Sequence, residues 1–234
     1  VAEGVRADHQ PDADALGDRR HRVEQRPALK DRLLPRPHDR QQVVPRPDRI
    51  PIGGWRESAA ANFYGFLGRD YLGTNELPKA IEHLRYAVQV RESLIGSLQR
   101  SKSYQYLRAN QDILVWNVQL LGLSYQRAQM FAEAIQAYEK ALSVIEVNRL
   151  QSYRAGSIYE SLARLYLQQK DTVRAEQYFV KAFESGSKLQ ISGQMTSSAI
   201  QLGNLAMQKE NPAEAVGYYE RAVRNIESSR SQIQ

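Results

Sequence analysis

Four histidines are the side chains in this sequence best suited to metal binding or to acid–base chemistry at neutral pH. His9, His21 and His38 are widely spaced in the first fifty residues, and His83 stands alone in a later, helix-forming segment. A metal site needs several ligands at defined spacing, and none of the four histidines has such neighbours. The sequence therefore predicts no metal site and no catalytic histidine.

The other motifs that could carry chemistry are incomplete. The acidic run at residues 12–18 lacks the central glycine and the terminal glutamate of a calcium loop. Gly53 and Gly54 do not continue into the Lys-Ser/Thr of a phosphate-binding loop. The chain has no cysteine nucleophile, disulfide or thiolate ligand, and it has no serine nucleophile elbow. We therefore predict a non-enzymatic protein without a cofactor.

The bulk composition is that of a globular chain. It has 234 residues, of which 42% are hydrophobic and 25% charged, and a formal net charge of +6. No run approaches the ~20 apolar residues of a membrane span, and residues 1–18 are too polar and acidic for a signal peptide. We expect a cytoplasmic protein with no small-molecule substrate. A nucleic-acid partner is not expected, because it would require Arg91, Arg100, Lys102 and Arg108 to share one face.

Residues 1–52 differ in composition from the rest of the chain. Seven of the nine prolines fall there, mixed with many Arg, His and Asp residues and few apolar ones. Proline disfavours helix, and so few apolar side chains cannot offset the entropy of ordering the chain. We predict a Pro/Arg-rich disordered arm that ends near residues 51–54. The alternatives are a basic arm that touches an anionic partner, and a wrongly assigned start codon or reading frame.

From residue 56 onward, one pattern of small and bulky residues occurs four times. A small residue follows a large aliphatic one, and a tyrosine usually stands three positions later. Twelve residues after the small residue comes an alanine, then a bulky residue four further on and a second alanine three beyond that. The small residues are Gly68, Gly122, Ala163 and Gly203; the first alanines are Ala80, Ala134, Ala175 and Ala215; the bulky residues are Leu84, Tyr138, Phe179 and Tyr219; and the second alanines are Ala87, Ala141, Ala182 and Ala222.

These spacings predict four pairs of α-helices over residues 56–229, followed by a short tail at 230–234. Residues three and four apart share one face of a helix, so each half of the pattern occupies one helix face. The small residues let the two helices approach, and the bulky ones fill the remaining volume. Asp171 and Asn211 are suited to capping the helices that follow them, and Pro212 suits a first helical turn.

The pattern resembles the tetratricopeptide repeat, whose template has the same small, aromatic, alanine, aromatic and alanine positions. Leu84 and Ala206 depart from two of the aromatic positions. Successive small residues are 54, 41 and 40 positions apart, against ~34 in the family. Longer repeats of this kind resemble those of kinesin light chains, of Leu-Gly-Asn-type adaptors and of arrays upstream of bacterial CHAT domains. The resemblance implies an all-α fold, a right-handed α-solenoid of about four helix pairs.

The first repeat step is the longest, and residues 89–114 contain no strong helix breaker. Close to helical spacing are Leu107, Ile113 or Leu114, Val118, Leu121 and Tyr125. We therefore predict that the first helix of the second pair begins early, near Ser103, and projects beyond the stack. An extra half-repeat in this segment is the alternative.

By this resemblance, the first helices line a concave groove in which a protein or peptide partner lies, extended or helical. Amide side chains there can pair with a peptide backbone, and arginines with carboxylates. The basic clamp that binds chaperone C-termini in some members is not reproduced, so a chaperone tail is not the expected partner. The alternative is that these polar side chains are only solvated. The residues predicted to bind the partner are Asn62, Arg69, Gln119, Gln126, Arg127, Glu160, Arg164, Gln201 and Asn204.

Two functions fit this prediction. The first is a protein-interaction scaffold that binds a peptide segment in the groove. The second is the regulatory or sensory arm of a larger bacterial signalling protein, for example a CHAT protease, whose catalytic domain lies outside this sequence. The last predicted helix carries Val216, Tyr219, Val223 and Ile226 with no capping helix after it. Because solenoid ends need a polar cap, we expect either a longer parent protein or self-association through this end.

Overall fold

The computed structural model describes residues 55–231, and within that range the chain forms eight α-helices and no β-strand. The predicted arm at residues 1–52 and the last residues of the predicted tail, 232–234, lie outside the described residues. The helices are α2 (Trp55–Gly73), α3 (Leu77–Arg100), α4 (Tyr104–Arg127), α5 (Phe131–Val147), α6 (Arg154–Gln168), α7 (Thr172–Lys188), α8 (Ser192–Gln208) and α9 (Pro212–Ser231).

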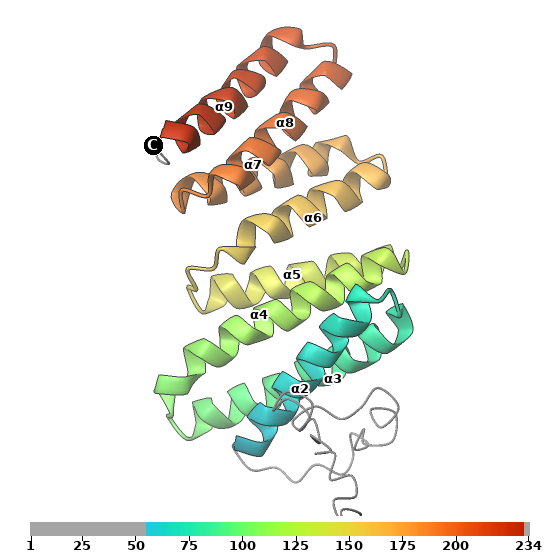
Figure 1. The fold of residues 1–234 in the computed structure, drawn as a ribbon, viewed down its shortest axis with the longest axis vertical. Helices are drawn as coiled ribbons and strands as arrows, with labels where there is room; N and C mark the ends of the chain where they lie inside the picture. Colours follow the sequence, from blue (N-terminus) through green and yellow to red (C-terminus); the bar gives the residue numbers. More distant parts are fainter. Residues whose placement is uncertain (1–54, 232–234) are drawn as a thin grey trace, which may run out of the picture. The chain divides into compact units, whose positions relative to one another are not determined.

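Consecutive helices pack against each other and form four pairs, α2/α3, α4/α5, α6/α7 and α8/α9. Figure 1 shows these pairs stacked in chain order, from α2 and α3 in blue-green to α8 and α9 in red. The first helix of each pair also touches the first helix of the next, since α2 contacts α4, α4 contacts α6 and α6 contacts α8. The prediction of an all-α solenoid with four helix pairs is therefore confirmed.

Within each pair, the small residue of the first helix faces the bulky residue of the second. A Cβ atom added at Gly122 would lie 2.8 Å from Tyr138 Cε1, and one added at Gly203 would lie 2.5 Å from Tyr219 Cε1. Carbon atoms do not pack that closely, so glycine is what allows these helices to approach. The alanines of the pattern are all buried, and they are Ala80, Ala87, Ala134, Ala141, Ala175, Ala182, Ala215 and Ala222.

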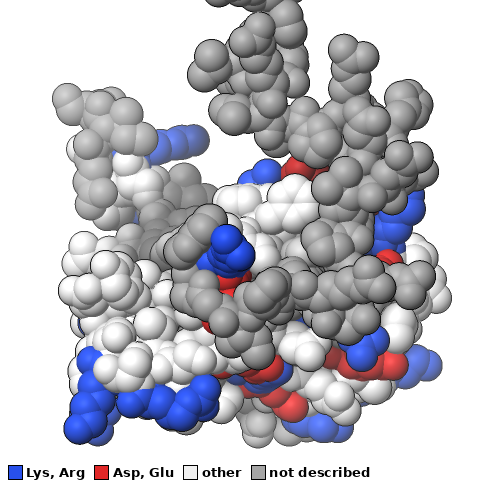
Figure 2. Space-filling view, turned by 90° about the horizontal axis from the view of Figure 1, so that it is seen from below, with Lys and Arg blue, Asp and Glu red and all other residues white. Residues whose placement is uncertain are grey.

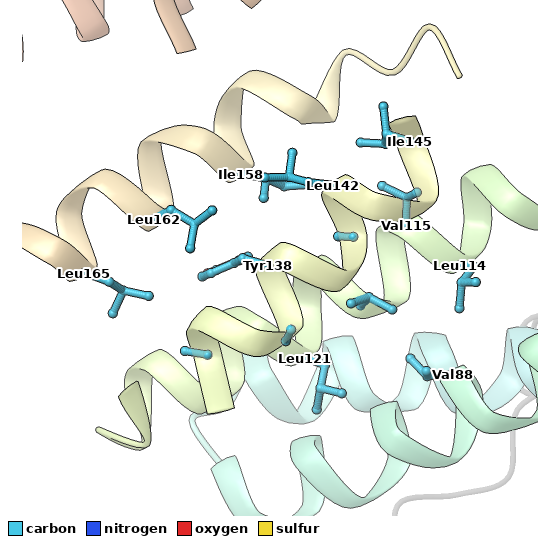
Figure 3. Close-up of a cluster of buried hydrophobic side chains, with 14 of the residues drawn as sticks. Val88, Leu114, Val115, Leu121, Tyr138, Leu142, Ile145, Ile158, Leu162 and Leu165 are labelled. Carbon is cyan, nitrogen blue, oxygen red and sulfur yellow. The ribbon is translucent and has the colours of Figure 1, made fainter. Parts of the chain in front are cut away.

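The largest apolar cluster runs through α3, α4, α5 and α6. In Figure 3, Tyr138 and Leu142 of α5 face Ile158 and Leu162 of α6, so this cluster joins the second helix pair to the third. Burial of such a continuous apolar surface between neighbouring repeats is what stabilises a solenoid. A second cluster joins α6 and α7 to α8, and it consists of Ala163, Phe179, Leu202 and Leu205.

The longest repeat step arises because two helices are lengthened. α4 begins at Tyr104, directly after Ser103, so its predicted early start is confirmed. Whether this start projects beyond the stack stays a prediction; α3 runs on to Arg100 and packs against α4. Arg91 of α3, for example, donates a hydrogen bond to Asn110 of α4. No helix lies between α3 and α4, which rules out the extra half-repeat.

The predicted N-terminal caps of α7 and α9 are also present, as is the proline predicted for a first helical turn. Asp171 Oδ1 accepts the backbone N–H of Arg174 over 2.9 Å, and Asn211 Oδ1 accepts that of Glu214 over 3.3 Å. Pro212 is the first residue of α9, where its missing N–H costs no intrahelical hydrogen bond. These caps satisfy backbone donors that every helix N-terminus leaves without a helical partner.

Each connection between two described helices contains one non-glycine residue with a positive φ. At Lys170, the N–H donates to the Leu167 carbonyl over 2.9 Å and the N–H of Asp171 donates to the Tyr166 carbonyl over 2.9 Å, which is the Schellman arrangement. A side chain in this left-handed conformation costs roughly 1–2 kcal/mol. The positive φ values, from 49° to 63°, belong to Asn75, Lys102, Gln129, Arg149, Lys170, Gln190 and Glu210.

Lys170→Gly is therefore expected to raise the free energy of unfolding by about 1 kcal/mol. Urea denaturation followed by circular dichroism would measure the gain. Lys170→Ala is the matched control, since it removes the same charged side chain but keeps the Cβ. An equal gain for both variants would show that the lysine side chain, and not the backbone conformation, is unfavourable at this position.

His83 is expected to make the stability of the fold depend on pH. Its imidazole is stacked between Tyr64 and Tyr71, with 5.7 Å and 5.3 Å between ring centroids. Burial of the ring lowers the pKa of His83 below its ordinary value. The unfolded chain therefore binds more protons at this position than the folded chain does once the pH falls to about 6.5. The free energy of unfolding should consequently fall as the pH decreases through that value.

Unfolding measured in urea at a series of pH values from about 8 to 5 would test this. His83→Gln keeps a polar side chain that does not titrate, and it should flatten the His83 contribution to the curve. A curve of the same slope in this variant would assign the pH dependence to other groups.

Candidate functional site

The first helices of successive pairs form one continuous surface, which we call the first-helix face. Phe66 of α2 contacts Trp116 of α4 edge-on, with 5.6 Å between ring centroids. Gln119 Nε2 of α4 donates a hydrogen bond to Ser157 Oγ of α6 over 2.9 Å. These contacts connect the first three helix pairs along a single row. The first-helix face, with Tyr153 included from the residue just before α6, consists of Asn62, Phe66, Arg69, Trp116, Gln119, Gln126, Tyr153, Arg154, Ser157, Glu160, Arg164 and Asn204.

Aromatic rings with guanidinium groups over them form the centre of this face. Phe66 is 48% exposed and Tyr153 is 62% exposed. Arg69 lies 5.2 Å from the centre of the Phe66 ring, while Arg154 lies 4.7 Å from that of Tyr153 and 5.9 Å from that of Trp116. Such cation–π contacts hold each guanidinium in place while its N–H groups still reach solvent.

A hollow of about 260 Å³ opens beside these rings, between α4 and the start of α6. Asp112 and Trp116 line it from α4, and Tyr153 and Arg154 line it from the other side. The hollow is large enough for one side chain of a partner, and its walls offer an aromatic ring, a guanidinium and a carboxylate.

In three of the predicted amide side chains, the oxygen already accepts a hydrogen bond from another side chain. Asn62 Oδ1 accepts a hydrogen bond from Arg91 Nη2 over 2.6 Å. The Tyr138 hydroxyl donates to Gln126 Oε1 over 3.1 Å, and the Tyr219 hydroxyl donates to Asn204 Oδ1 over 2.8 Å. Burial raises the pKa of Tyr138 to about 12, so its hydroxyl keeps its proton at neutral pH.

Each of these bonds fixes the orientation of an amide and leaves its NH₂ group available as a donor. Gln119 differs, because its NH₂ donates to Ser157 and its oxygen accepts from Arg154 Nη1 over 3.5 Å. Gln201 is half-buried on α8. The amides of the first-helix face therefore offer a partner mainly donors.

The predicted charged residues have structural contacts of their own. Glu160 is buried; it accepts a hydrogen bond from Ser198 Oγ over 2.9 Å and pairs with Arg164 at 3.3 Å. Arg69 pairs with Asp70 at 3.0 Å, one residue along α2. Arg69 and Asp70 are both half-exposed, so their pair contributes little stability and Arg69 can exchange it for a partner's carboxylate. Arg164 is half-exposed too, but its partner Glu160 is buried.

Arg127 lies apart from the other predicted residues. Its Nη1 donates to the backbone carbonyl of Leu72 over 3.0 Å, and so it caps the last turn of α2 from the neighbouring repeat. The structure thus brings Glu160 and Arg164 together, while Arg127 joins two repeats. Whether the nine predicted residues bind a partner stays a prediction.

Sequence reasoning missed Phe66, Trp116, Tyr153 and Arg154. Phe66 stands two positions before the small residue of its repeat, and Trp116 stands six before. Tyr153 and Arg154 come from the connection between α5 and α6 and from the first residue of α6. None of these offsets belongs to the repeated pattern, so the only available signal was the presence of large aromatic residues outside it.

Within residues 55–231, the four cations that a nucleic-acid site would require do not share one exposed face. Arg91, one of those four cations, is fully buried. On the face seen in Figure 2, basic side chains stand in separate groups with acidic ones between them, wherever that face belongs to described residues.

Residues 55–231 contain no group of three or more His, Asp or Glu side chains that could hold a metal ion. None of the helices in that range has both the length and the apolar character needed to cross a membrane.

The last described helix, α9, has an exposed apolar strip. Val216 is 54% exposed, Val223 is 51% exposed and Ile226 is 41% exposed. Self-association through this apolar strip stays a prediction.

Comparison with known proteins places the repeats in a family. The tetratricopeptide repeat family matches residues 112–186 and again residues 198–231. These matches cover α5, α6 and α9 and most of α4, α7 and α8. No match was found among curated proteins.

Several solved structures are similar in part. BtubC (BKLC) from P. vanneervenii is 23% identical, with a TM-score of 0.48 over 74% of this chain and 73% of that one. PilF of Pseudomonas aeruginosa is 17% identical, with a TM-score of 0.41 over 72% of this chain and 78% of that one. A putative kinesin light chain of Podosopora anserina is 13% identical, with a TM-score of 0.44 over 72% of this chain and 95% of that one. The two family matches and the repeated packing of small against bulky residues identify the chain as a member of the tetratricopeptide repeat family.

Proposed function

We propose that this protein is an interaction scaffold whose first-helix face is the wall of a concave groove and binds a peptide segment of another protein. Tetratricopeptide folds are typically non-catalytic, and solenoids present long surfaces of this kind. The observation that carries the proposal is the group of exposed aromatic rings with guanidinium groups over them. On the same face lie amide side chains whose oxygens already accept hydrogen bonds, so that their NH₂ groups remain as donors.

The chemistry of the face indicates what the partner offers. Trp116, Phe66 and Tyr153 supply rigid apolar area, and aromatic and arginine side chains dominate binding energy in protein interfaces. The amide NH₂ groups and the arginines are donors, so they fit backbone carbonyls and acidic side chains. The expected partner is therefore a peptide that carries both apolar and acidic residues.

A photo-crosslinking amino acid at position 116 should capture such a partner in cells, because Trp116 is at the centre of the face. The matched control is the same crosslinker at position 85, since Arg85 is exposed on α3, a second helix. Mass spectrometry of the crosslinked peptide would identify the bound segment. Equal crosslinking at the two positions would contradict a site on the first-helix face.

With the identified peptide, Arg69→Ala/Arg164→Ala/Asn204→Ala should weaken binding by roughly thirtyfold or more, which is ~2 kcal/mol. A control variant removes three equivalent exposed side chains from second helices: Arg85→Ala/Gln136→Ala/Arg224→Ala. Fluorescence anisotropy would measure both affinities, and circular dichroism would check that both variants fold. Unchanged affinity in the first variant would reject the assignment of this face.

A further inference from the structure

Arg91 is a buried cation without an anionic partner. It is 0% exposed on α3 and joins three helices, because Nη1 donates to Asn110 Oδ1 over 2.5 Å and to Ser58 Oγ over 3.5 Å, and Nη2 donates to Asn62 Oδ1 over 2.6 Å. No carboxylate of the described residues lies within ion-pair distance of the guanidinium, and Nε has no hydrogen-bond partner there.

Burying a charge without a counter-charge is costly, and structures rarely keep one for stability alone. Burial lowers the pKa of Arg91 to about 10, so the guanidinium is still charged at neutral pH. A guanidinium has five N–H donors, and the three hydrogen bonds to Ser58, Asn62 and Asn110 leave two of them unused.

A cavity of about 650 Å³ lies next to this cation, where the start of α2, the end of α3 and the start of α4 meet. Ser58, Asn62 and Asn110, the three residues that hold Arg91, all line it. The rest of the lining is mostly apolar and consists of Ala59, Leu94, Leu98, Ser103 and Tyr106. One wall of the cavity is therefore polar and lies against the positive charge of Arg91, and the other walls are mostly apolar.

The polar wall is oriented to donate hydrogen bonds. Because the Asn62 and Asn110 oxygens point to Arg91, their NH₂ groups point away from it, and that of Asn110 donates to the Tyr106 carbonyl over 2.7 Å. The Asn62 NH₂ group and the Ser103 hydroxyl remain as donors on the lining. Ser103 also immediately precedes α4, whose N-terminal end carries a partial positive charge.

We propose that this cavity binds a small apolar monocarboxylic acid, with the carboxylate against the Asn62–Ser103 wall and the hydrocarbon chain against Leu94 and Leu98. The bound carboxylate supplies the counter-charge that Arg91 lacks. The volume lies within the range of about 300–1,000 Å³ typical of small-molecule sites. This site shares only Asn62 with the first-helix face proposed above to bind a peptide, and it binds a ligand without converting it.

Isothermal titration calorimetry of the full chain with sodium octanoate and sodium decanoate would test the proposal. Binding at micromolar to millimolar concentrations is expected, together with a rise in Tm, and 1-octanol and octylammonium should bind at least about tenfold more weakly. No binding of either acid at millimolar concentration, or equal binding of the alcohol, would overturn the proposal.

Two variants separate a ligand site from a purely structural role of Arg91. Arg91→Met should lower the affinity for octanoate by at least about tenfold, and Arg91→Lys should retain most of it, because the charge is kept. Ala59→Trp fills the cavity from the exposed side of α2, so it should abolish binding even if Arg91→Met does not fold. Full octanoate affinity in Ala59→Trp, or in folded Arg91→Met, would place the acid elsewhere and overturn the assignment.

Discussion

Phe179→Ala should lower the free energy of unfolding by about 3–5 kcal/mol, which is a large fraction of the stability of a domain this size. The Phe179 ring is 0% exposed and lies in the cluster that joins α6 and α7 to α8. Its removal leaves a cavity against Ala163, Leu202 and Leu205, and helices can only partly close such a cavity. Urea denaturation monitored by circular dichroism would measure the loss.

The position of Phe179 also determines how the loss appears. In a solenoid, stability is approximately a sum of repeat terms and nearest-neighbour interface terms. A cavity at the interface between the third and fourth pairs should therefore uncouple α8 and α9 and produce an early unfolding step or a smaller m-value. Val173→Ala is the matched control, since Val173 lies on the same helix, is 62% exposed, and should change stability by at most about 0.5 kcal/mol. If Phe179→Ala also lowered the free energy of unfolding by no more than this, the cluster would not couple α8 and α9 to the third helix pair.

Gly122→Ala should destabilise the protein by about 1–3 kcal/mol, although alanine is the better helix former. The added methyl group would lie 2.8 Å from Tyr138 Cε1 and 2.9 Å from its Cδ1. Tyr138 is 1% exposed and packed in the main cluster, so its ring cannot move aside without forcing the helices apart. Thermal and urea unfolding would both record the loss.

Gly217→Ala is the control that isolates this effect. Gly217 lies inside α9, and a Cβ added there would meet nothing within 4 Å. The same substitution should therefore raise stability by about 0.5–1 kcal/mol through helix propensity alone. The two changes are predicted to have opposite signs. A gain in both would mean that Tyr138 can move without cost, and that glycine is not needed for close packing of α4 and α5.

Much of the candidate site followed from the repeat alone, since the helix that carries each predicted residue could be assigned from the spacing. Glu160 and Arg164 were placed on one helix face, and the structure pairs them at 3.3 Å. What the spacing could not supply was the partner of each side chain. Asn62 meets Arg91 of the next helix, and Arg127 reaches the carbonyl of Leu72 from the neighbouring repeat. The angle between successive helix pairs sets such meetings, and no periodicity in the sequence records it.

The sequence by itself determined the helices, their pairing and the small-against-bulky contacts within each pair. These depend on 3.6 residues per turn and on connections too short to allow another partner. Gly203 had to face Tyr219 once both helices formed, and the structure shows that contact. The caps at Asp171 and Asn211 are local for the same reason.

Only the tertiary structure decided which side chains of different repeats come together. In the tertiary structure, the rings of Phe66 and Trp116 are in contact although the two residues are fifty positions apart in the sequence. The tertiary structure also buried Arg91 of α3, which no spacing in the sequence predicts, because Ser58 and Asn62 of α2 and Asn110 of the lengthened α4 surround its guanidinium. Contacts between repeats depend on small rotations that accumulate from one pair to the next, so they emerge only when the whole stack is assembled.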